Sequence, residues 1–177
     1  MDDLTALAVA ARDGNRMALG AFIRAAQPEV WRFCAHLAGV HEADDVVQDV
    51  FVAAHRSLPS FRAEASARTW LFTIARRRVA DRARSARRRR ALYERLVAQR
   101  PVTTSGGPDV AWTLVDALGE PLRTAFVLTQ ASGLSYEEAA RVCACPVGTI
   151  RSRVARARER LIAQLADHEV AADEAEA

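Results

Sequence analysis

Residues Ser135–Leu161 read SYEEAARVCACPVGTIRSRVARARERL, which is the pattern of two short helices joined by a tight turn. Ser135 and Glu138 have the Ser-x-x-Glu spacing of a capping box, so a helix is predicted to start at Ser135. The turn is expected at residues 144–145. Pro146 then suits the first position of the next helix, because its missing N–H would have had no partner there. The stretch therefore predicts a helix-turn-helix, whose second helix enters a DNA major groove.

The second of these helices has two distinct faces. Apolar residues recur at three- and four-residue steps and predict a core stripe: Val147, Ile150, Val154, Ala157, Leu161 and Leu165. The opposite side carries Gly148, Thr149, Ser152, Ala155 and Arg156, flanked by Arg151, Arg153, Arg158 and Arg160. An exposed helix can carry arginines simply as a solvated face. Five arginines against one acid, without alternating signs, favour contact with DNA.

The charge of the chain is strongly segregated along its 177 residues. All 25 basic residues are arginine, which we attribute mainly to a bias toward G and C in the gene. Residues 62–100 hold 13 arginines against three acids, and residues 141–160 hold six against one. Two separate basic blocks suggest two contacts with a polyanion. Neither block has the bulky apolar face needed for a membrane surface, so nucleic acid is favoured.

The periodicity predicts an all-α fold, two small helical domains joined by a flexible linker. Residues 97–109 are rich in Pro, Gly, Ser and Thr and form the predicted linker, and the acidic tail 167–177 is predicted to be disordered. The predicted helices begin with one that ends at Gly14 and continue with Met17–Ala26, Glu29–Leu37, His41–Leu58, Thr69–Arg95, Val110–Leu118 and Pro121–Ala131. The three cysteines (Cys34, Cys143 and Cys145) lack a preceding secretory signal or nearby zinc partners and are expected to be buried or half-buried thiols in a reducing cytoplasm.

A polar cluster is predicted in the helix ADDVVQDVFVAAHRSL, residues 43–58. Asp45, Gln48 and Asp49 lie at i, i+3 and i+4 and so share one outward face, with Asp44 expected at the helix start. Such a face could bind metal, take part in catalysis, dock a protein or simply be solvated. Composition alone favours the solvated face, since no pocket or partner base is evident for catalysis.

The helix TWLFTIARRRVADRARSARRRR, residues 69–90, presents a second basic face. Leu71, Ala75 and Val79 are expected to point toward a core. The opposite side carries Trp70, Thr73, Arg77, Arg84 and Arg88. An indole beside guanidinium groups can stack on a base while the arginines follow phosphates. A buried core tryptophan is an equally weighted alternative.

Taken in order, these blocks resemble a bacterial RNA polymerase sigma factor of the extracytoplasmic-function (ECF) type, over about Ala6 to Leu165. ADDVVQDVF resembles the polymerase-docking helix of that family. SFRAEASARTWLFTIARRRVADRAR resembles its minus-ten segment, and GLSYEEAARVCACPVGTIRSRVARARERL resembles its minus-thirty-five reader. The resemblance implies that residues 1–96 form sigma region 2 and residues 110–166 form the region 4 helix-turn-helix.

The resemblance also implies roles for individual residues and partners. Polymerase contacts, to the clamp helices of the largest subunit, fall on Asp44, Asp45, Gln48 and Asp49. Minus-ten contacts fall on Phe61, Arg62, Ala63, Arg76 and Arg77, with the loop at Phe61 holding a flipped base. The basic face of the helix adds Trp70 and Arg84 to this set. Minus-thirty-five contacts fall on Arg151, Ser152, Ala155 and Arg156, and the two-faced pattern of the helix adds Thr149 and Arg153. The flap of the second-largest polymerase subunit and an anti-sigma protein are further candidate partners. Cofactors, metals, membrane association and catalytic activity are not expected.

The implied mechanism is promoter recognition and DNA melting in the bacterial cytoplasm, with the polymerase forming all bonds. A second hypothesis is a helix-turn-helix transcriptional regulator that is not a polymerase subunit. Such a regulator would not need the DDVVQD block or the Trp–Arg helix. A third hypothesis, an RNA-binding structural protein using the arginine run, leaves the capped helix-turn-helix unexplained.

Overall fold

The computed structural model describes residues 2–96 and 114–176, and side chains for residues 2–88 and 114–166. It contains helices and no strand in the described ranges, as the predicted all-α fold requires. The helices are α1 (Asp3–Arg12), α2 (Arg16–Ala38), α3 (Val40–Ser57), α4 (Ala67–Leu96), α6 (Glu120–Phe126), α7 (Tyr136–Cys143) and α8 (Val147–Glu176). A short 3₁₀ turn, η1 (Leu58–Ser60), follows α3, and a π-helical turn, η2 (Val127–Ala131), follows α6.

The chain divides into two compact units, the first containing α1 to α4 and the second containing α6, η2, most of α7 and α8. The predicted linker, residues 97–109, lies outside the described residues, as do residues 110–113 of the predicted helix 110–118, of which Leu114–Asp116 are helical. The proposed domain limits therefore stay a prediction.

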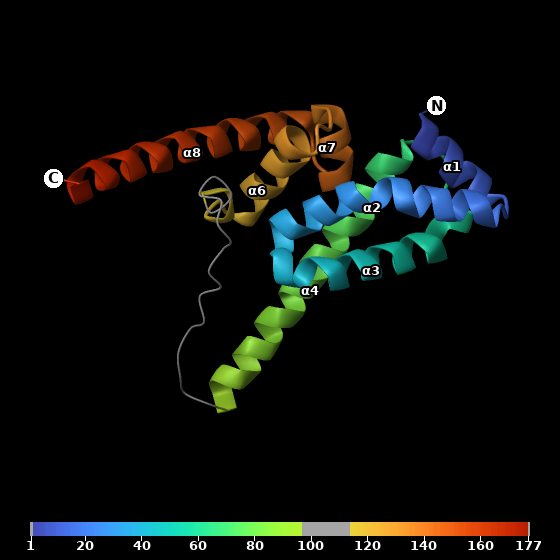
Figure 1. Ribbon diagram of the computed structural model, residues 1–177, viewed down its shortest axis with the longest axis horizontal. Helices are drawn as coiled ribbons and strands as arrows, with labels where there is room; N and C mark the ends of the chain where they lie inside the picture. The colour runs from blue at the N-terminus through green and yellow to red at the C-terminus, as the bar shows by residue number, and fades with distance from the viewer. Residues whose placement is uncertain (1, 97–113, 177) are drawn as a thin grey trace. The chain divides into compact units, whose positions relative to one another are not determined.

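The core of the first unit forms where α2 packs against α1, α3 and α4. In Figure 1, α2 and α3 lie side by side and α4 crosses this pair, extending beyond it at its C-terminal end. Phe33 of α2 meets Phe72 of α4 edge to face, with ring centroids 4.9 Å apart. Both rings are buried, together with Val46 and Val50 of α3. Phe72, which the periodicity analysis did not single out, is therefore a central contact between α2 and α4.

Pro28 does not end a helix, which corrects the predicted break between Met17–Ala26 and Glu29–Leu37. The helix α2 runs without interruption from Arg16 to Ala38, with Pro28 inside it. Pro28 and Arg24 are both exposed, so water can reach the Arg24 carbonyl that loses its helical partner. Burial of Phe22 and Val30 on either side stabilises both halves against the same neighbours.

The N-terminal helix α1 is capped and tied to α4 by one buried threonine. Asp2 accepts hydrogen bonds from the backbone N–H of Thr5 at 2.9 Å and from its hydroxyl at 2.7 Å. The Thr5 hydroxyl bond is the main cause that lowers the pKa of Asp2. The same Thr5 oxygen accepts a hydrogen bond from the backbone N–H of Ala67, the first residue of α4, at 2.8 Å.

The predicted capping box of the second unit is confirmed. The Ser135 N–H donates to the Glu138 carboxylate at 2.9 Å, and the Glu138 N–H donates to the Ser135 hydroxyl at 3.1 Å. The turn after α7 is also where expected, with Ala144 in the left-handed region at φ 51°. Pro146 lies one residue before α8 rather than at its first position, and its carbonyl accepts from the N–H of Thr149 at 2.9 Å.

The apolar stripe of α8 is buried only in its first part. Ile150, Val154 and Ala157 are at most 1% exposed, but Leu165 is 47% exposed, so its predicted burial is wrong. The reason is the length of α8. Its thirty residues extend about 45 Å, which is longer than the packed part of the second unit, so Leu165 has no core to enter. The predicted disordered tail also differs from the structure, since α8 continues to Glu176. Alanine and glutamate, which dominate that segment, are strong helix formers.

The cysteines are buried or half-buried thiols, as predicted. Cys34 and Cys143 are buried, and Cys145 is intermediate. Burial raises the pKa of the Cys34 thiol to about 12.

Candidate nucleic-acid interface

The acidic face of α3, formed by Asp44, Asp45, Gln48 and Asp49, is exposed as the sequence predicted. It is presented outward because the opposite side of α3 fills the core with Ala43, Val46, Val47, Val50 and Ala54. Asp44 does not lie at the helix start, which corrects that expectation. Gly39 precedes the first turn, so Asp44 follows one turn later.

Two members of this acidic face are bound from within the protein. The Trp31 indole N–H of α2 donates to Asp44 at 2.8 Å. The Arg82 guanidinium of α4 donates through Nε to Glu42 and through Nη2 to Asp45 at 2.8 Å. These bonds, to Glu42 first and then to Asp45, raise the pKa of Arg82. Gln48 and Asp49 make no hydrogen bond or ion pair to any other described side chain, so they are the uncommitted half of the face.

Neither Trp31 nor Arg82 was assigned a role from the sequence. Trp31 was expected only as a residue available for burial, and Arg82 was one of the 13 arginines of residues 62–100. The spacing along α4 could not separate Arg82 from its neighbours. Its position opposite Glu42 and Asp45 depends on how α3 and α4 pack.

The loop of residues 61–66 connects η1 to α4 and contains three predicted minus-ten residues. Phe61 is 5% exposed and packs on Trp70 of α4, with ring centroids 4.9 Å apart. Trp70 is half-buried, and its ring centroid lies 6.4 Å from that of Phe22. Part of the indole therefore packs in the core, and part of it is open to solvent. Arg62 is exposed, 3.8 Å from Glu64, and Ala63 has a positive φ of 56°. Both aromatic side chains therefore contribute to folding, and only Trp70 presents surface to a ligand.

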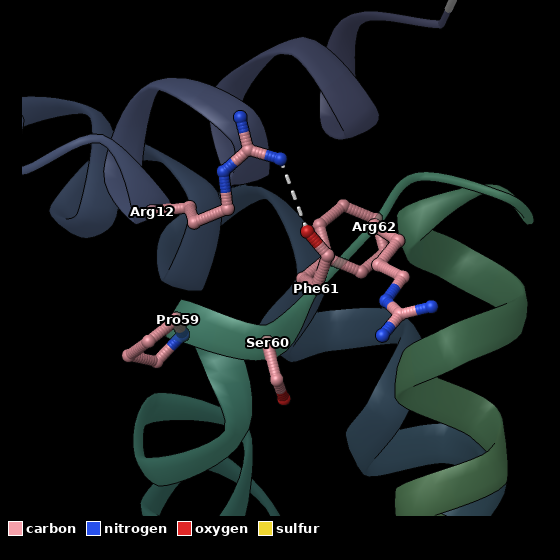
Figure 2. A pocket seen from close by; sticks show the side chains of 5 residues that line it. All are labelled: Arg12, Pro59, Ser60, Phe61 and Arg62. Carbon is pink, nitrogen blue, oxygen red and sulfur yellow. Dashed lines mark hydrogen bonds between the residues drawn. The ribbon is translucent and has the colours of Figure 1, made fainter.

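Figure 2 shows the hollow on one side of this loop, lined by Arg12, Pro59, Ser60, Phe61 and Arg62. The Arg12 guanidinium of α1 donates to the Phe61 carbonyl at 3.1 Å. Arg12, like Arg82, was not among the predicted site residues. The bond joins residues 49 positions apart, which no local pattern in the sequence can predict.

The predicted DNA-facing arginines of α4 differ in their surroundings. Arg77 is exposed and makes no ion pair with a described side chain. Arg84 is exposed but is paired with Asp81 one turn earlier. Arg76 is half-buried, and its Nε has no hydrogen-bond acceptor among the described residues. Arg77 is thus the cation of the three most available to a ligand.

The predicted groove face of α8 is exposed at Arg151, Ser152, Ala155 and Arg156. Thr149 and Arg153 are half-buried, and Arg153 lies 4.0 Å from the Cys145 sulfur. The flanking Arg158 donates to Gln130 of η2 at 2.7 Å, which anchors α8 to the preceding turn. Arg156 makes no hydrogen bond to a described group, so it is available to a base edge.

No cluster of three His, Cys, Asp or Glu side chains among the described residues could bind a metal ion. Nor does any helix in this part of the chain have the length and apolar character to span a bilayer.

Comparison with known proteins identifies the two units. The family model Sigma-70 region 2 matches residues 22–89, and Sigma-70, region 4 matches residues 109–161. ECF RNA polymerase sigma factor SigC of Mycobacterium tuberculosis is 48% identical over 166 residues, covering 90% of each chain. The chain belongs to the ECF sigma factors of the sigma-70 family. This sigma factor is also 33% identical to ECF RNA polymerase sigma-E factor of Haemophilus influenzae, over 88% of this chain and 92% of that protein.

Two solved structures share the fold of this ECF sigma factor. The sigma factor RpoE of Bartonella quintana, solved with the anti-sigma factor NepR, matches with a TM-score of 0.69 and 33% identity, over 81% of this chain and 93% of that one. CnrH, solved with the cytosolic domain of CnrY, matches with a TM-score of 0.74 and 29% identity, over 94% and 99%. The predicted family and the two-domain helical fold are confirmed.

Proposed function

We propose that this sigma factor binds core RNA polymerase, recognises minus-thirty-five and minus-ten promoter elements, and promotes melting of the DNA for transcription initiation. The acidic face of α3 carries the proposal furthest, since it is an exposed carboxylate and amide surface on the same unit as the basic helix α4. A DNA-binding regulator would not need such a face. The regulator hypothesis is therefore not favoured.

The proposed mechanism divides the work between the two units. In the second unit, α8 binds duplex DNA through phosphate contacts and a few base edges. In the first unit, the 61–66 loop and the exposed part of α4 hold an unstacked base. Flipping a base costs a few kcal/mol, which these contacts and the polymerase contacts must offset. We assign no reaction to the sigma factor itself, and we place its activity in the bacterial cytoplasm.

The function is tested by reconstituting transcription with purified core polymerase. Promoters are selected from a random DNA library by the complex of core polymerase and this protein. Specific start sites are expected only when the protein is present. Transcripts that start equally well with core polymerase alone, or that need another sigma factor, would favour the regulator hypothesis.

Core binding should depend on the acidic face of α3, and mostly on its uncommitted half, Gln48 and Asp49. Changing Asp45, Gln48 and Asp49 together to alanine should weaken core affinity several-fold, because three side chains on one exposed face are removed. The melting temperature should change little, since the Asp45–Arg82 ion pair is exposed and such pairs contribute about 1 kcal/mol or less. Fluorescence anisotropy of labelled sigma factor titrated with core polymerase measures the affinity.

Two matched variants accompany the triple change. Asp3→Ala removes an exposed acid from α1 and should leave core affinity unchanged. The double change Gln48→Ala and Asp49→Ala leaves the Arg82 network intact and should reproduce most of the loss. Unaltered core affinity in both multiple variants would remove the docking role from this face.

Arg77 should act on promoter opening more than on duplex binding. It is exposed on α4 and makes no ion pair with a described side chain, and Arg77→Ala should slow open-complex formation while closed-complex binding is nearly unchanged. A template already melted across the minus-ten bases removes the unpairing cost, so it should restore part of the activity. Permanganate footprinting measures opening on both templates. Equal impairment on the two templates, with normal stability, would contradict the opening role.

We also propose that region 2 comprises residues 1–96 and region 4 residues 110–166. An anti-sigma factor is a candidate partner, since the structurally similar sigma factor RpoE of Bartonella quintana was solved with the anti-sigma factor NepR. Co-purification of the tagged protein from its host, followed by mass spectrometry, tests this second proposal.

A further inference from the structure

The N-terminal helix α1 has been given no function by the motifs or by the comparisons. The Sigma-70 region 2 match begins at residue 22, after α1 has ended at Arg12. Yet α1 packs against α2, α4 and η1. Because η1 and α4 flank the 61–66 loop, these contacts place α1 beside the loop.

One end of the 61–66 loop is bound by Arg12. Its Nη1 donates to the Phe61 carbonyl at 3.1 Å, the bond drawn in Figure 2. The other edge of the guanidinium is held by Asp13, which accepts from Nε at 2.8 Å and from Nη2 at 3.3 Å. The hydrogen bonds to Asp13 raise the pKa of Arg12 above its usual value. Arg12 is thus a charged donor held in one orientation.

The other end of the loop is bound by Thr5, seven residues earlier in the same helix. Its hydroxyl oxygen accepts the N–H of Ala67, the residue that follows the loop, at 2.8 Å. Thr5 is 4% exposed, and its own hydroxyl proton is directed to Asp2. A single helix therefore makes hydrogen bonds to both ends of the loop.

The residues between these two ends have little regular structure of their own to fix them. Arg62, Ala63 and Glu64 are all exposed and lie outside any helix. Ala63 has a φ of 56°, a left-handed conformation that is uncommon and costly for a residue with a Cβ. A conformation of this kind persists when the surrounding structure holds it in place.

We propose that Arg12 and Thr5 are positioning residues, which hold the 61–66 loop in the conformation that receives the flipped minus-ten base. This inference rests on the proposed function of the loop. The two residues act through the backbone of Phe61 and Ala67 and do not touch the base. Removing either bond should loosen the loop and reduce selection for the captured base, while leaving duplex recognition by α8 unchanged.

The first measurement is amide hydrogen exchange on the full-length protein, read over residues 61–67. Arg12→Ala should raise exchange in this segment, and Arg16→Ala is the matched control, since it removes an exposed arginine close to the same end of α1. Thr5→Val should raise exchange at the Ala67 end, and Thr5→Ser, which keeps the hydroxyl, should restore protection. Unchanged exchange in both Arg12→Ala and Thr5→Val would overturn the proposal.

The second measurement uses the complex with core polymerase and single-stranded non-template oligonucleotides that carry the selected minus-ten sequence. Each oligonucleotide is compared with one that has an abasic site at a single position. The wild-type ratio of affinities identifies the captured base. Arg12→Ala should reduce that ratio about tenfold, with binding of the abasic oligonucleotide unchanged. Arg12→Lys, which retains a charged N–H donor, should recover part of the ratio.

The outcomes separate this inference from the function on which it rests. A wild-type ratio near one at every position would refute base capture itself, and the positioning role with it. A clear wild-type preference that Arg12→Ala leaves intact would overturn only the positioning role. An equal loss on normal and abasic oligonucleotides, with raised exchange, would assign α1 a general structural role and contradict the proposal.

Discussion

Replacing Phe61 by alanine should lower the free energy of unfolding of the first unit by about 3 kcal/mol. The ring is 5% exposed and packs on Trp70, so its removal loses buried apolar surface and leaves a cavity beside the indole. For a unit of this size the melting temperature should fall by more than about 10 °C. Thermal unfolding followed by circular dichroism measures the shift.

Phe61→Leu is the control for this effect. It keeps an apolar side chain in the same space, so it should cost clearly less than Phe61→Ala. A melting temperature for Phe61→Ala within a degree of wild type would show that the ring is dispensable for folding. In that case a defect in promoter opening could be assigned to Phe61 directly. Otherwise Arg77, which is exposed, is the better probe of opening.

Replacing Arg156 by alanine should weaken binding to a cognate minus-thirty-five duplex by about 1–3 kcal/mol and relax the preference at one base pair. Arg156 is exposed on the groove face of α8 and makes no hydrogen bond to a described group. A guanidinium in this position can bind a guanine edge through two hydrogen bonds. Competition binding with single-base variants of the selected duplex measures both effects.

Arg160 is the matched control for Arg156. It is exposed on the flank of the same helix, so Arg160→Ala should weaken binding to cognate and random duplexes alike and reduce the salt dependence by about one ion. Arg153 is a poorer control, because it is half-buried near Cys145. If Arg156→Ala also lost equal affinity on cognate and random duplexes, its role would be phosphate binding and not base readout.

The parts of the fold that depend on local chemistry could be predicted from the sequence. The reciprocal bonds of Ser135 and Glu138 need only four consecutive residues, and they are present. The outward acidic face of α3 follows from a strict apolar periodicity on its other side. The predicted burial of α8 is correct only as far as Ala157. The periodicity of one helix does not show how far along it the neighbouring helices extend to cover its apolar side.

The parts that depend on packing between distant segments could not be predicted. A proline usually ends a helix, but Pro28 lies inside α2. Burial of Phe22 and Val30 on either side of it outweighs the single hydrogen bond that the proline removes. Nothing in the sequence distinguishes Arg12 and Arg82 from the other arginines expected at the surface. Their partners, the Phe61 carbonyl and the Glu42 and Asp45 carboxylates, lie 37 to 49 positions away in the chain.

The chain contains no lysine, and Arg82 is a position where lysine could not replace arginine. We attribute the use of arginine as the default cation to a bias in nucleotide composition, and at the exposed Arg87 lysine would serve equally well. At Arg82 the two carboxylates bind different nitrogens of one planar fork. The single ammonium of lysine does not reproduce that geometry. A change to lysine would therefore be tolerated at a solvated arginine such as Arg87, but at Arg82 it would lose one of the two carboxylate contacts.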